Sequence, residues 1–298
     1  MNKNKSFTLI ELLVVIVIIG ILAGVIMIST SSSIDKSNFA KAQAFSSTIQ
    51  NELLSNLVSE WTFDEPQEGN ITKDSWGNSH GTVVGATQVD DCVFGKCYSF
   101  DGTSDVIKIL DKPEFNLDDQ ASVFVWVRAN SSISTRVIFS QWDYGINQRQ
   151  WVILTDAGGG KKLRVYISSD GTLNNIKDYT TINDIFDNSW RYVGFVWDKG
   201  VLKLYVDGRE MGVTKTKDLA FTSMFNSSVD VMMGCWLNNN QSINFFPGVM
   251  DNVRIYNAAL SSSQIKQNYI AGLESLLSKG TISSSEFKEN IAKMSSNR

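Results

Sequence analysis

The stretch Lys203-Leu204-Tyr205-Val206-Asp207-Gly208-Arg209-Glu210-Met211 shows what kind of structure most of the chain forms. Polar and apolar residues alternate before the Asp-Gly pair, as in a strand with one buried face. Asp-Gly favours the tight turn of a β-hairpin, because both central positions of that turn need a positive φ. The stretch therefore predicts two antiparallel strands joined at Asp207-Gly208.

Short segments of the same kind lie on both sides of this hairpin, over residues 60–261. They are separated by Gly, Asn, Asp and Ser, and Asp170-Gly171 is a second candidate turn. The other expected strands are 83–84, 97–100, 106–109, 121–127, 137–140, 151–154, 162–167, 190–197, 229–234 and 248–255. Many short strands with regularly spaced turns predict an antiparallel two-sheet sandwich.

The N-terminal region is of a different kind. Residues 6–24 read SFTLIELLVVIVIIGILAG, and no charged residue occurs from Leu12 to Ser33. This run exceeds the ~7–15 apolar residues of a secretory signal peptide, whereas ~20 apolar residues span a bilayer. A carboxylate costs roughly 3 kcal/mol in lipid. A simple membrane anchor therefore leaves Glu11 unexplained.

The segment Phe7-Thr8-Leu9-Ile10-Glu11, followed by LLVVI, resembles the N-terminal motif of type IV pilins and of type II secretion pseudopilins. The resemblance covers about residues 1–33. It implies a leader of residues 1–6, which a prepilin peptidase removes by cutting between Ser6 and Phe7 before the new amine is methylated.

Glu11 then becomes the fifth residue of the mature chain, where it can pair with the Phe7 amine of a neighbouring subunit. Breaking a buried ion pair costs about 3–5 kcal/mol, so this pairing would favour assembly. Gly20 and Gly24 form a G-x-x-x-G step, which allows helices to approach closely in lipid. Chance explains such a short motif equally well.

A helical pattern continues beyond the membrane segment. Apolar residues recur at three- and four-residue steps, at Phe39, Ala42, Phe45, Ile49, Leu53, Leu54 and Leu57. We therefore expect one long helix over residues 7–59, with a membrane half at about 7–33 and an amphipathic half at about 34–59.

An ordered set of motifs within residues 60–261 resembles the laminin-G-like, concanavalin A-like jelly roll. The motifs are EWTFD at 60–64, YSFDGTSD at 98–105, SVFVWV at 122–127, WRYV at 190–193, LYVDG at 204–208 and GVMDNVRIYNAALS at 248–261. The resemblance implies two curved antiparallel sheets that carry a carbohydrate or protein ligand on the concave face or the loops. The expected fold is thus mainly β, with a long N-terminal helix.

Two sets of site residues follow from this expectation. Loop aromatics are the usual sugar platforms, and the candidates are Trp76, Trp142, Tyr144 and Trp236, although each ring is equally well explained as core or rim packing. The resemblance also implies a structural Ca²⁺, which takes 6–8 oxygen ligands. The matching donors are Asp64, Asp74, Asn78 and Asp251, and the alternative is that these are turn-forming residues.

The cysteines indicate an oxidising compartment. Cys92 and Cys97 stand close together in DDCVFGKC, and Gly95 permits a tight turn between them, so we expect a disulfide. A metal site would need two further ligands at matching spacing, which the sequence lacks. Cys235 follows the apolar run Val231–Gly234 and is expected to be a buried free thiol.

The C-terminal segment, residues 262–298, reads as a short helical hairpin. Ile265, Tyr269, Leu273, Leu276 and Leu277 share one face of a helix that Gly280 ends. Ser283 and Glu286 form a capping box for a second helix. The apolar face predicts docking on this chain or on another subunit, and a frayed tail is the alternative.

The remaining features narrow the function. A net charge of −4 without a basic cluster argues against nucleic acid as a partner. The single histidine, His80, lies in a loop-like stretch and is expected to be structural. The Glu-x-Asp-x-Glu strand pattern of jelly-roll glycoside hydrolases is absent from the sequence.

We therefore expect a non-enzymatic minor pilin or pseudopilin that displays an adhesive jelly roll. The alternative is a membrane-anchored glycan hydrolase on a pilin-type anchor. The expected partners are the prepilin peptidase, other pilin subunits, the membrane before assembly, and a surface glycan or protein. The expected location is a single-pass cytoplasmic-membrane precursor with a cytoplasmic N-terminus and an extracytoplasmic globular domain, followed by a cell-surface filament.

Overall fold

The computed structural model describes residues 54–65, 69–129 and 135–295. The predicted leader, the expected membrane helix and the residues Ser6, Phe7, Glu11, Gly20 and Gly24 lie outside the described residues. Within the described part, no helix has the length and apolar character needed to cross a membrane.

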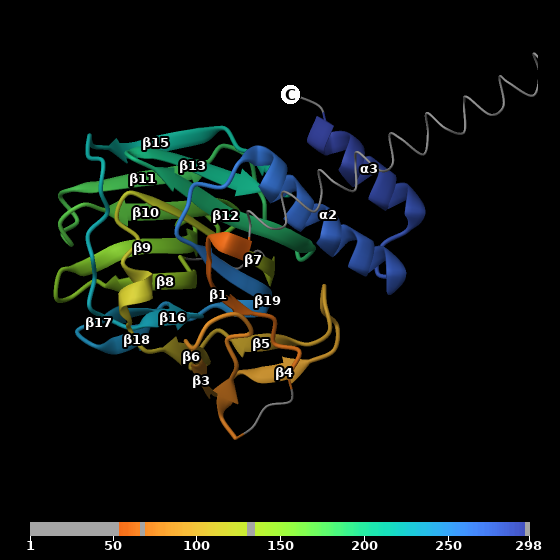
Figure 1. Ribbon diagram of the computed structural model, residues 1–298, viewed down its shortest axis with the longest axis horizontal. Helices are drawn as coiled ribbons and strands as arrows, with labels where there is room; N and C mark the ends of the chain where they lie inside the picture. The colour runs from red at the N-terminus through yellow and green to blue at the C-terminus, as the bar shows by residue number, and fades with distance from the viewer. Residues whose placement is uncertain (1–53, 66–68, 130–134, 296–298) are drawn as a thin grey trace, which may run out of the picture. The chain divides into compact units, whose positions relative to one another are not determined.

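Two sheets make up the body of the domain (Figure 1). Sheet A has eight strands in the order β14-β13-β12-β7-β19-β5-β4, with β1 also beside β19, and all of its pairs are antiparallel. Its strands are β1 Leu57–Trp61, β4 Thr87–Val89, β5 Cys97–Asp101, β7 Gln120–Ala129, β12 Trp190–Asp198, β13 Val201–Val206, β14 Arg209–Glu210 and β19 Pro247–Tyr256.

Sheet B has eleven strands in the order β15-β11-β10-β9-β8-β16-β6-β3-β2, and β17 lies beside both β8 and β18. Its one parallel contact among the described strands joins Leu237 of β17 to Asp143 of β8. Its strands are β2 Ile71–Thr72, β3 Gly81–Val84, β6 Val106–Ile109, β8 Val137–Asp143, β9 Gln148–Thr155, β10 Leu163–Ser168, β11 Ile176–Thr181, β15 Val213–Asp218, β16 Val231–Met233, β17 Trp236–Asn238 and β18 Gln241–Ile243. A 3₁₀ turn, η1, covers Pro113–Phe115. The predicted antiparallel sandwich is therefore confirmed.

The predicted hairpin with its turn at Asp207-Gly208 is also confirmed. Val206 of β13 faces Arg209 of β14, and Asp207 and Gly208 between them have φ values of 50° and 76°. Two positive φ values in a row are typical of the type I′ turn that follows the twist of a two-stranded ribbon.

The core lies between the sheets, and β7 shows how the sequence pattern builds it. Val123, Val125 and Val127 point into the core. The alternate residues Phe124 and Trp126 point outward but are also buried, because a helix covers this face of sheet A. A strand buried on both faces is apolar throughout, which explains the run SVFVWV.

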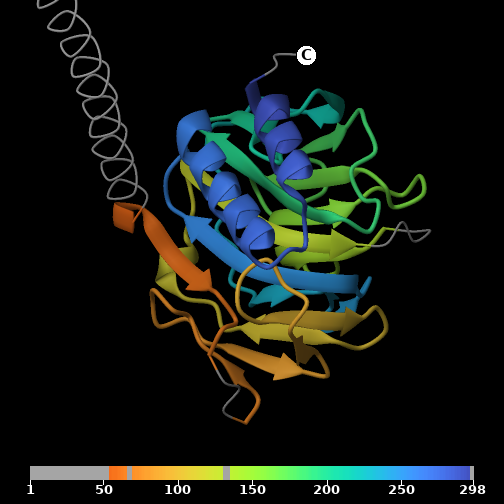
Figure 2. The same cartoon turned by 90° about the vertical axis from the view of Figure 1, so that its right-hand side faces the viewer.

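That helix is α2, Ser262–Ser278, and it is followed by α3, Ser284–Ser295; Figure 2 shows both over sheet A. The ring of Tyr269 stacks on Trp126 with centroids 5.4 Å apart. Gly272 permits this approach, because a Cβ there would lie 2.1 Å from the Trp126 ring. The predicted helical hairpin and its docking on this chain are therefore confirmed.

One predicted boundary is wrong. We assigned Leu57–Ser59 to the end of the long helix, but these residues form the first half of β1, which pairs with β19. Leu57 and Ser59 are buried and Val58 is half-buried, so the segment has the two-residue period of a strand. Leu57 fitted the helical spacing as well, and only pairing with the last strand decides between the two.

Candidate functional site

Two loops at the ends of strands in sheet B are joined by a single buried carboxylate. Asp143 ends β8 and is fully buried. Its side chain accepts backbone hydrogen bonds from the N–H groups of Gly145 at 2.8 Å, Ile146 at 3.3 Å, Asn239 at 2.9 Å and Asn240 at 2.7 Å. Hydrogen bonds to a carboxylate are stronger than neutral ones, so Asp143 ties the β8–β9 connection to the β17–β18 turn.

The joined loops present a mixed aromatic and amide surface, which we call the Tyr144 platform: Tyr144, Ile146, Asn239 and Asn240. Tyr144 is 44% exposed, Ile146 is 43% exposed, and the two asparagines are also exposed. Figure 1 shows the β8–β9 and β17–β18 connections on the same side of the sandwich. The backbone approach is close, because a Cβ at Gly145 would lie 2.4 Å from the Asn239 amide.

Two buried tryptophan rings stack in series against the ring of Tyr144. Trp236 stacks on Tyr144 with centroids 5.9 Å apart and planes 28° apart, and Trp142 stacks on Trp236 at 6.4 Å and 18°. Trp142 is fully buried and Trp236 is 8% exposed. The expectation that Trp142 meets a ligand directly therefore needs correction: burial in the outer cluster of sheet B makes it a support for the exposed ring.

Arg149 of β9 packs against the rings of the Tyr144 platform, and the sequence did not identify it as a site residue. Its guanidinium carbon lies 5.0 Å from the Tyr144 ring centroid and 5.9 Å from that of Trp142. It donates hydrogen bonds to the backbone carbonyls of Tyr144 and Gly171. Burial is the main effect on its pKa, and it lowers that pKa from the usual value for arginine. No sequence signal identifies Arg149, because its pairing with Trp142 across the β8–β9 hairpin follows a register shift that only the structure shows.

Trp76, the fourth predicted ligand aromatic, is 48% exposed and lies in the β2–β3 connection. In sheet B, β16 and β6 separate β3 from β8, so the structure does not bring Trp76 to the Tyr144 platform. His80, in the same connection, accepts a hydrogen bond at Nδ1 from the N–H of Asp74 at 3.1 Å. This contact is the structural turn role expected for His80.

The four predicted calcium ligands fall into two separate groups. Asp74 is satisfied by the backbone, since its carboxylate accepts N–H bonds from Glu60, Trp76, Gly77 and Ser79 at 2.8–3.1 Å. The Asn78 carbonyl accepts a hydrogen bond from the Lys112 ammonium. These two residues therefore shape the β2–β3 connection, and they do not join the other pair.

Asp64 and Asp251 lie on either side of the loop that follows β4. Asp64 accepts a hydrogen bond from the N–H of Lys96, and Asp251 from that of Phe94, each at 2.8 Å. Asp251 is fully buried, and its Oδ1 has no partner within the described part of the chain. Burial, with a smaller contribution from Asp64, raises the pKa of Asp251 to about 8. Among the described residues no third His, Cys, Asp or Glu joins this pair to form a metal-binding group, so the other oxygen ligands of a Ca²⁺ here would have to come from the backbone, amides or water.

The cysteine predictions are confirmed. Cys92 and Cys97 form a disulfide with Cα atoms 5.6 Å apart, and Cys235 is free and buried. Burial raises the pKa of the Cys235 thiol to about 12. The bridged loop is also held by α2, because Ser275 donates a hydrogen bond to the Val93 carbonyl.

Comparison with known families gives two matches. Residues 101–266 match the family described as the concanavalin A-like lectin/glucanases superfamily, and residues 1–27 match the prokaryotic N-terminal methylation motif. No curated protein matches the chain.

Several solved structures share the fold. The binding domain of Paraclostridial Mosquitocidal Protein 1 is 18% identical with a TM-score of 0.57, and the match covers 74% of this chain and 53% of that one. Domain 4 of AbnA, a GH43 extracellular arabinanase from Geobacillus stearothermophilus in complex with arabinotriose, is 24% identical with a TM-score of 0.53, covering 71% and 97%. The ligand binding domain of botulinum neurotoxin serotype D in complex with N-acetylneuraminic acid is 14% identical with a TM-score of 0.55, covering 74% and 52%. This chain thus spans about half the length of the two toxin domains.

Proposed function

The chain belongs to the concanavalin A-like lectin/glucanases superfamily and begins with a prokaryotic N-terminal methylation motif, and we propose that it is a minor pilin or pseudopilin whose jelly roll binds a surface carbohydrate at the Tyr144 platform. The observation that carries the binding half is an exposed ring, Tyr144, held flat by Trp236 and Arg149 and flanked by two exposed amides. A ring face stacks on the apolar face of a sugar, and amide groups pair with hydroxyls.

The relatives add support of a general kind. One of the similar domains is described in complex with arabinotriose and another in complex with N-acetylneuraminic acid. Their identity to this chain is low, so they support the fold and agree with the proposed class of ligand. The proposed position of the site rests on the surroundings of Tyr144.

The experiment is a glycan array with the full chain in detergent, followed by calorimetry on the best ligands. We expect Tyr144→Ala to weaken binding about tenfold or more and Tyr144→Phe to retain it, because the ring and not the hydroxyl makes the contact. Leu110→Ala is the matched control, since Leu110 is 62% exposed and lies outside the platform. Array binding that Tyr144→Ala leaves unchanged would overturn the proposed site.

The display half of the proposal concerns assembly. The methylation motif implies a membrane-anchored pilin precursor, and we propose cleavage between Ser6 and Phe7 by a prepilin peptidase. Mass spectrometry of the mature chain should find an N-methylated Phe7 at its start. A low-copy or tip role predicts sparse immunogold labelling of filaments, and continuous decoration would contradict it.

We also propose that the bound glycan is not cleaved. Incubation of the protein with a bound oligosaccharide should release no shorter products. Hydrolysis that a single Asp or Glu substitution abolishes would instead establish the anchored glycan hydrolase.

A structural Ca²⁺ completes the proposal, with Asp64 and Asp251 as the carboxylates that would hold it. The ion would neutralise two carboxylates that face the disulfide loop. Calcium should then raise the melting temperature at pH 8, and Asp64→Asn should remove that increase, whereas Asp74→Asn should leave it in place.

A further inference from the structure

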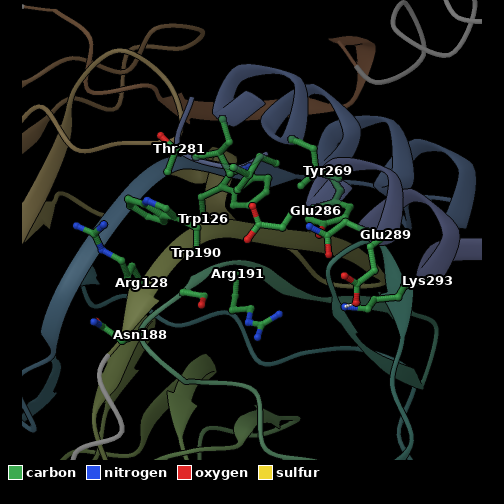
Figure 3. Close-up of a pocket in the computed structure, with 15 residues that line it drawn as sticks. Trp126, Arg128, Asn188, Trp190, Arg191, Tyr269, Thr281, Glu286, Glu289 and Lys293 are labelled. Atoms are coloured by element: carbon green, nitrogen blue, oxygen red, sulfur yellow. Dashed lines mark ion pairs between the residues drawn. The ribbon is translucent and has the colours of Figure 1, made fainter. Parts of the chain in front are cut away.

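A cleft lies on the outer face of sheet A, beneath the two C-terminal helices (Figure 3). Its volume is about 390 Å³. Strand β12 and the adjoining end of β7 supply its floor, including Trp190 and Arg128, while α2 and α3 supply its walls. This cleft is independent of the Tyr144 platform, which lies on two strand connections of sheet B.

Polar side chains of α3 form one rim of the cleft. Glu286, Glu289, Asn290 and Lys293, which share one face of the helix, line it, and all but Asn290 are exposed. Phe287 and Ile291, on another face, are half-buried, and Met294 is buried. The helix therefore docks by its apolar stripe and offers polar side chains at the open rim of the cleft.

The cleft is held open by contacts at both ends of α3. At its C-terminal end, Met294 is buried against the hairpin turn, where a Cβ at Gly208 would lie 3.0 Å from its sulfur. Before its N-terminal end, the N–H groups of Thr281 and Ile282 donate hydrogen bonds to the Leu276 carbonyl of α2, at 2.9 and 3.4 Å. The helix therefore bridges the cleft as a fixed element, and the site is formed before a ligand arrives.

Most of the charged groups around the cleft are paired. Lys293 pairs with Glu289 at 2.8 Å, Arg128 with Asp91 at 2.7 Å, and Arg191 with Asp187 at 2.6 Å. An anionic ligand would have to break these pairs, and it would also meet the Glu286 carboxylate, which caps α3. The uncharged groups that the cleft offers a ligand include the amides of Asn188 and Asn290 and the Trp190 ring.

Trp190 supplies the ring face on the floor. The guanidinium of Arg128 lies 5.1 Å from its ring centroid. Its buried indole N–H has no hydrogen-bond acceptor among the residues that the structure describes. This N–H is shielded from the cleft, so the ring face is the part of Trp190 that a ligand can contact.

We propose that this cleft is a second binding site and takes a short neutral oligosaccharide. The ring face, the amides and the largely paired charges match a polyhydroxylated ligand without net charge. Leu273, Leu276 and Ile282 also line the cleft, but a lipid tail there would cover the amides of Asn188 and Asn290 without giving them hydrogen-bond partners. An extended peptide has no strand edge to join, because β7 and β12 are paired on both sides.

The test uses the full chain in detergent and hydrogen exchange read by mass spectrometry. The probes are neutral arabino-, xylo-, gluco- and manno-oligosaccharides of three to six units, with sialylated and uronic acid oligosaccharides as the acidic set. At least one neutral probe should slow amide exchange in α3, residues 284–295. Protection by acidic probes only, or by none of the probes, overturns the inference.

Variants locate the effect. Trp190→Ala and Asn290→Ala should each lower the affinity for the protecting oligosaccharide about tenfold. Lys288→Ala, on the exposed side of the same helix, should leave that affinity unchanged. Asn290→Ala serves where the tryptophan variant does not fold. Protection of α3 that survives both substitutions refutes the site. Tyr144→Ala should leave α3 protection intact, so a failure here and a failure of the Tyr144 platform give different results.

Discussion

Asp143 offers the sharpest test of how the Tyr144 platform is built. Replacing it with asparagine keeps the shape of the side chain but turns one acceptor oxygen into an N–H₂ group. The amide oxygen can still serve the three N–H groups of Gly145, Ile146 and Asn239 at Oδ1. The N–H₂ group must then face the N–H of Asn240, which Oδ2 accepts at 2.7 Å.

The magnitude follows from that count. One charge-assisted hydrogen bond is lost, worth about 1.5–3 kcal/mol, and the remaining three are weakened. We expect Asp143→Asn to lower the free energy of unfolding by about 2–3 kcal/mol. For a domain of this size that corresponds to a melting temperature lower by roughly 4–12 °C.

The assay is thermal unfolding of the full chain in detergent, followed by near-UV circular dichroism, with glycan affinity measured on the same samples. The affinity should fall about tenfold, because the two loops that carry Tyr144 and Asn240 are no longer joined. Asp119→Asn is the control: Asp119 is exposed, and its carboxylate accepts a hydrogen bond only from the Ser223 hydroxyl among the contacts described. If Asp143→Asn matches this control in both measurements, the role assigned to Asp143 is wrong.

Three further predictions concern other parts of the chain. With a chelator present, the melting temperature of the wild type should fall relative to that of Asp251→Asn as the pH rises from about 4 to about 8. The reason is that a carboxyl whose pKa is raised to about 8 in the folded state stabilises that state only while it is protonated. Melting temperatures of the two proteins that change in parallel across this range would contradict the prediction. Arg254→Ala should cost about 3 kcal/mol, because it leaves Glu60, paired with Arg254 at 2.6 Å, without its cation, and chemical denaturation against Lys203→Ala as the exposed control measures this. Glu11→Ala should leave the protein in the membrane but keep it out of filaments, as fractionation and immunoblotting would show, and normal incorporation would refute the pairing with the Phe7 amine.

Local chemistry accounts for the parts of the fold that the sequence predicted well. The Asp207-Gly208 turn needs only two positive φ values, and the Cys92–Cys97 bridge needs only a short loop. The caps of the C-terminal helices likewise depend on residues three positions apart, such as Ser283 and Glu286. Each of these features is decided within a few residues, so a pattern in the sequence suffices to find it.

The candidate sites were only partly predictable, because they depend on contacts between distant segments. Tyr144 and Trp236 were both proposed as ligand aromatics, but no pattern indicated that they stack on each other or that Trp142 lies buried behind them. The proposed calcium set mixed two groups for the same reason. Asp64 and Asp74 are near in sequence, yet Asp64 meets the loop beside Asp251 and Asp74 closes its own turn.

By itself, the sequence determined the antiparallel hairpins, the disulfide, the capped C-terminal helices and the pilin-type start, since each depends on local spacing and residue type. Only the tertiary structure decided that Leu57 begins a strand, that Asp143 joins loops almost a hundred residues apart, and that α2 and α3 cover the outer face of sheet A. Which segments meet is set by packing of the whole sandwich, where pairing between the first and last strands outweighs a helical spacing that is equally consistent with the sequence.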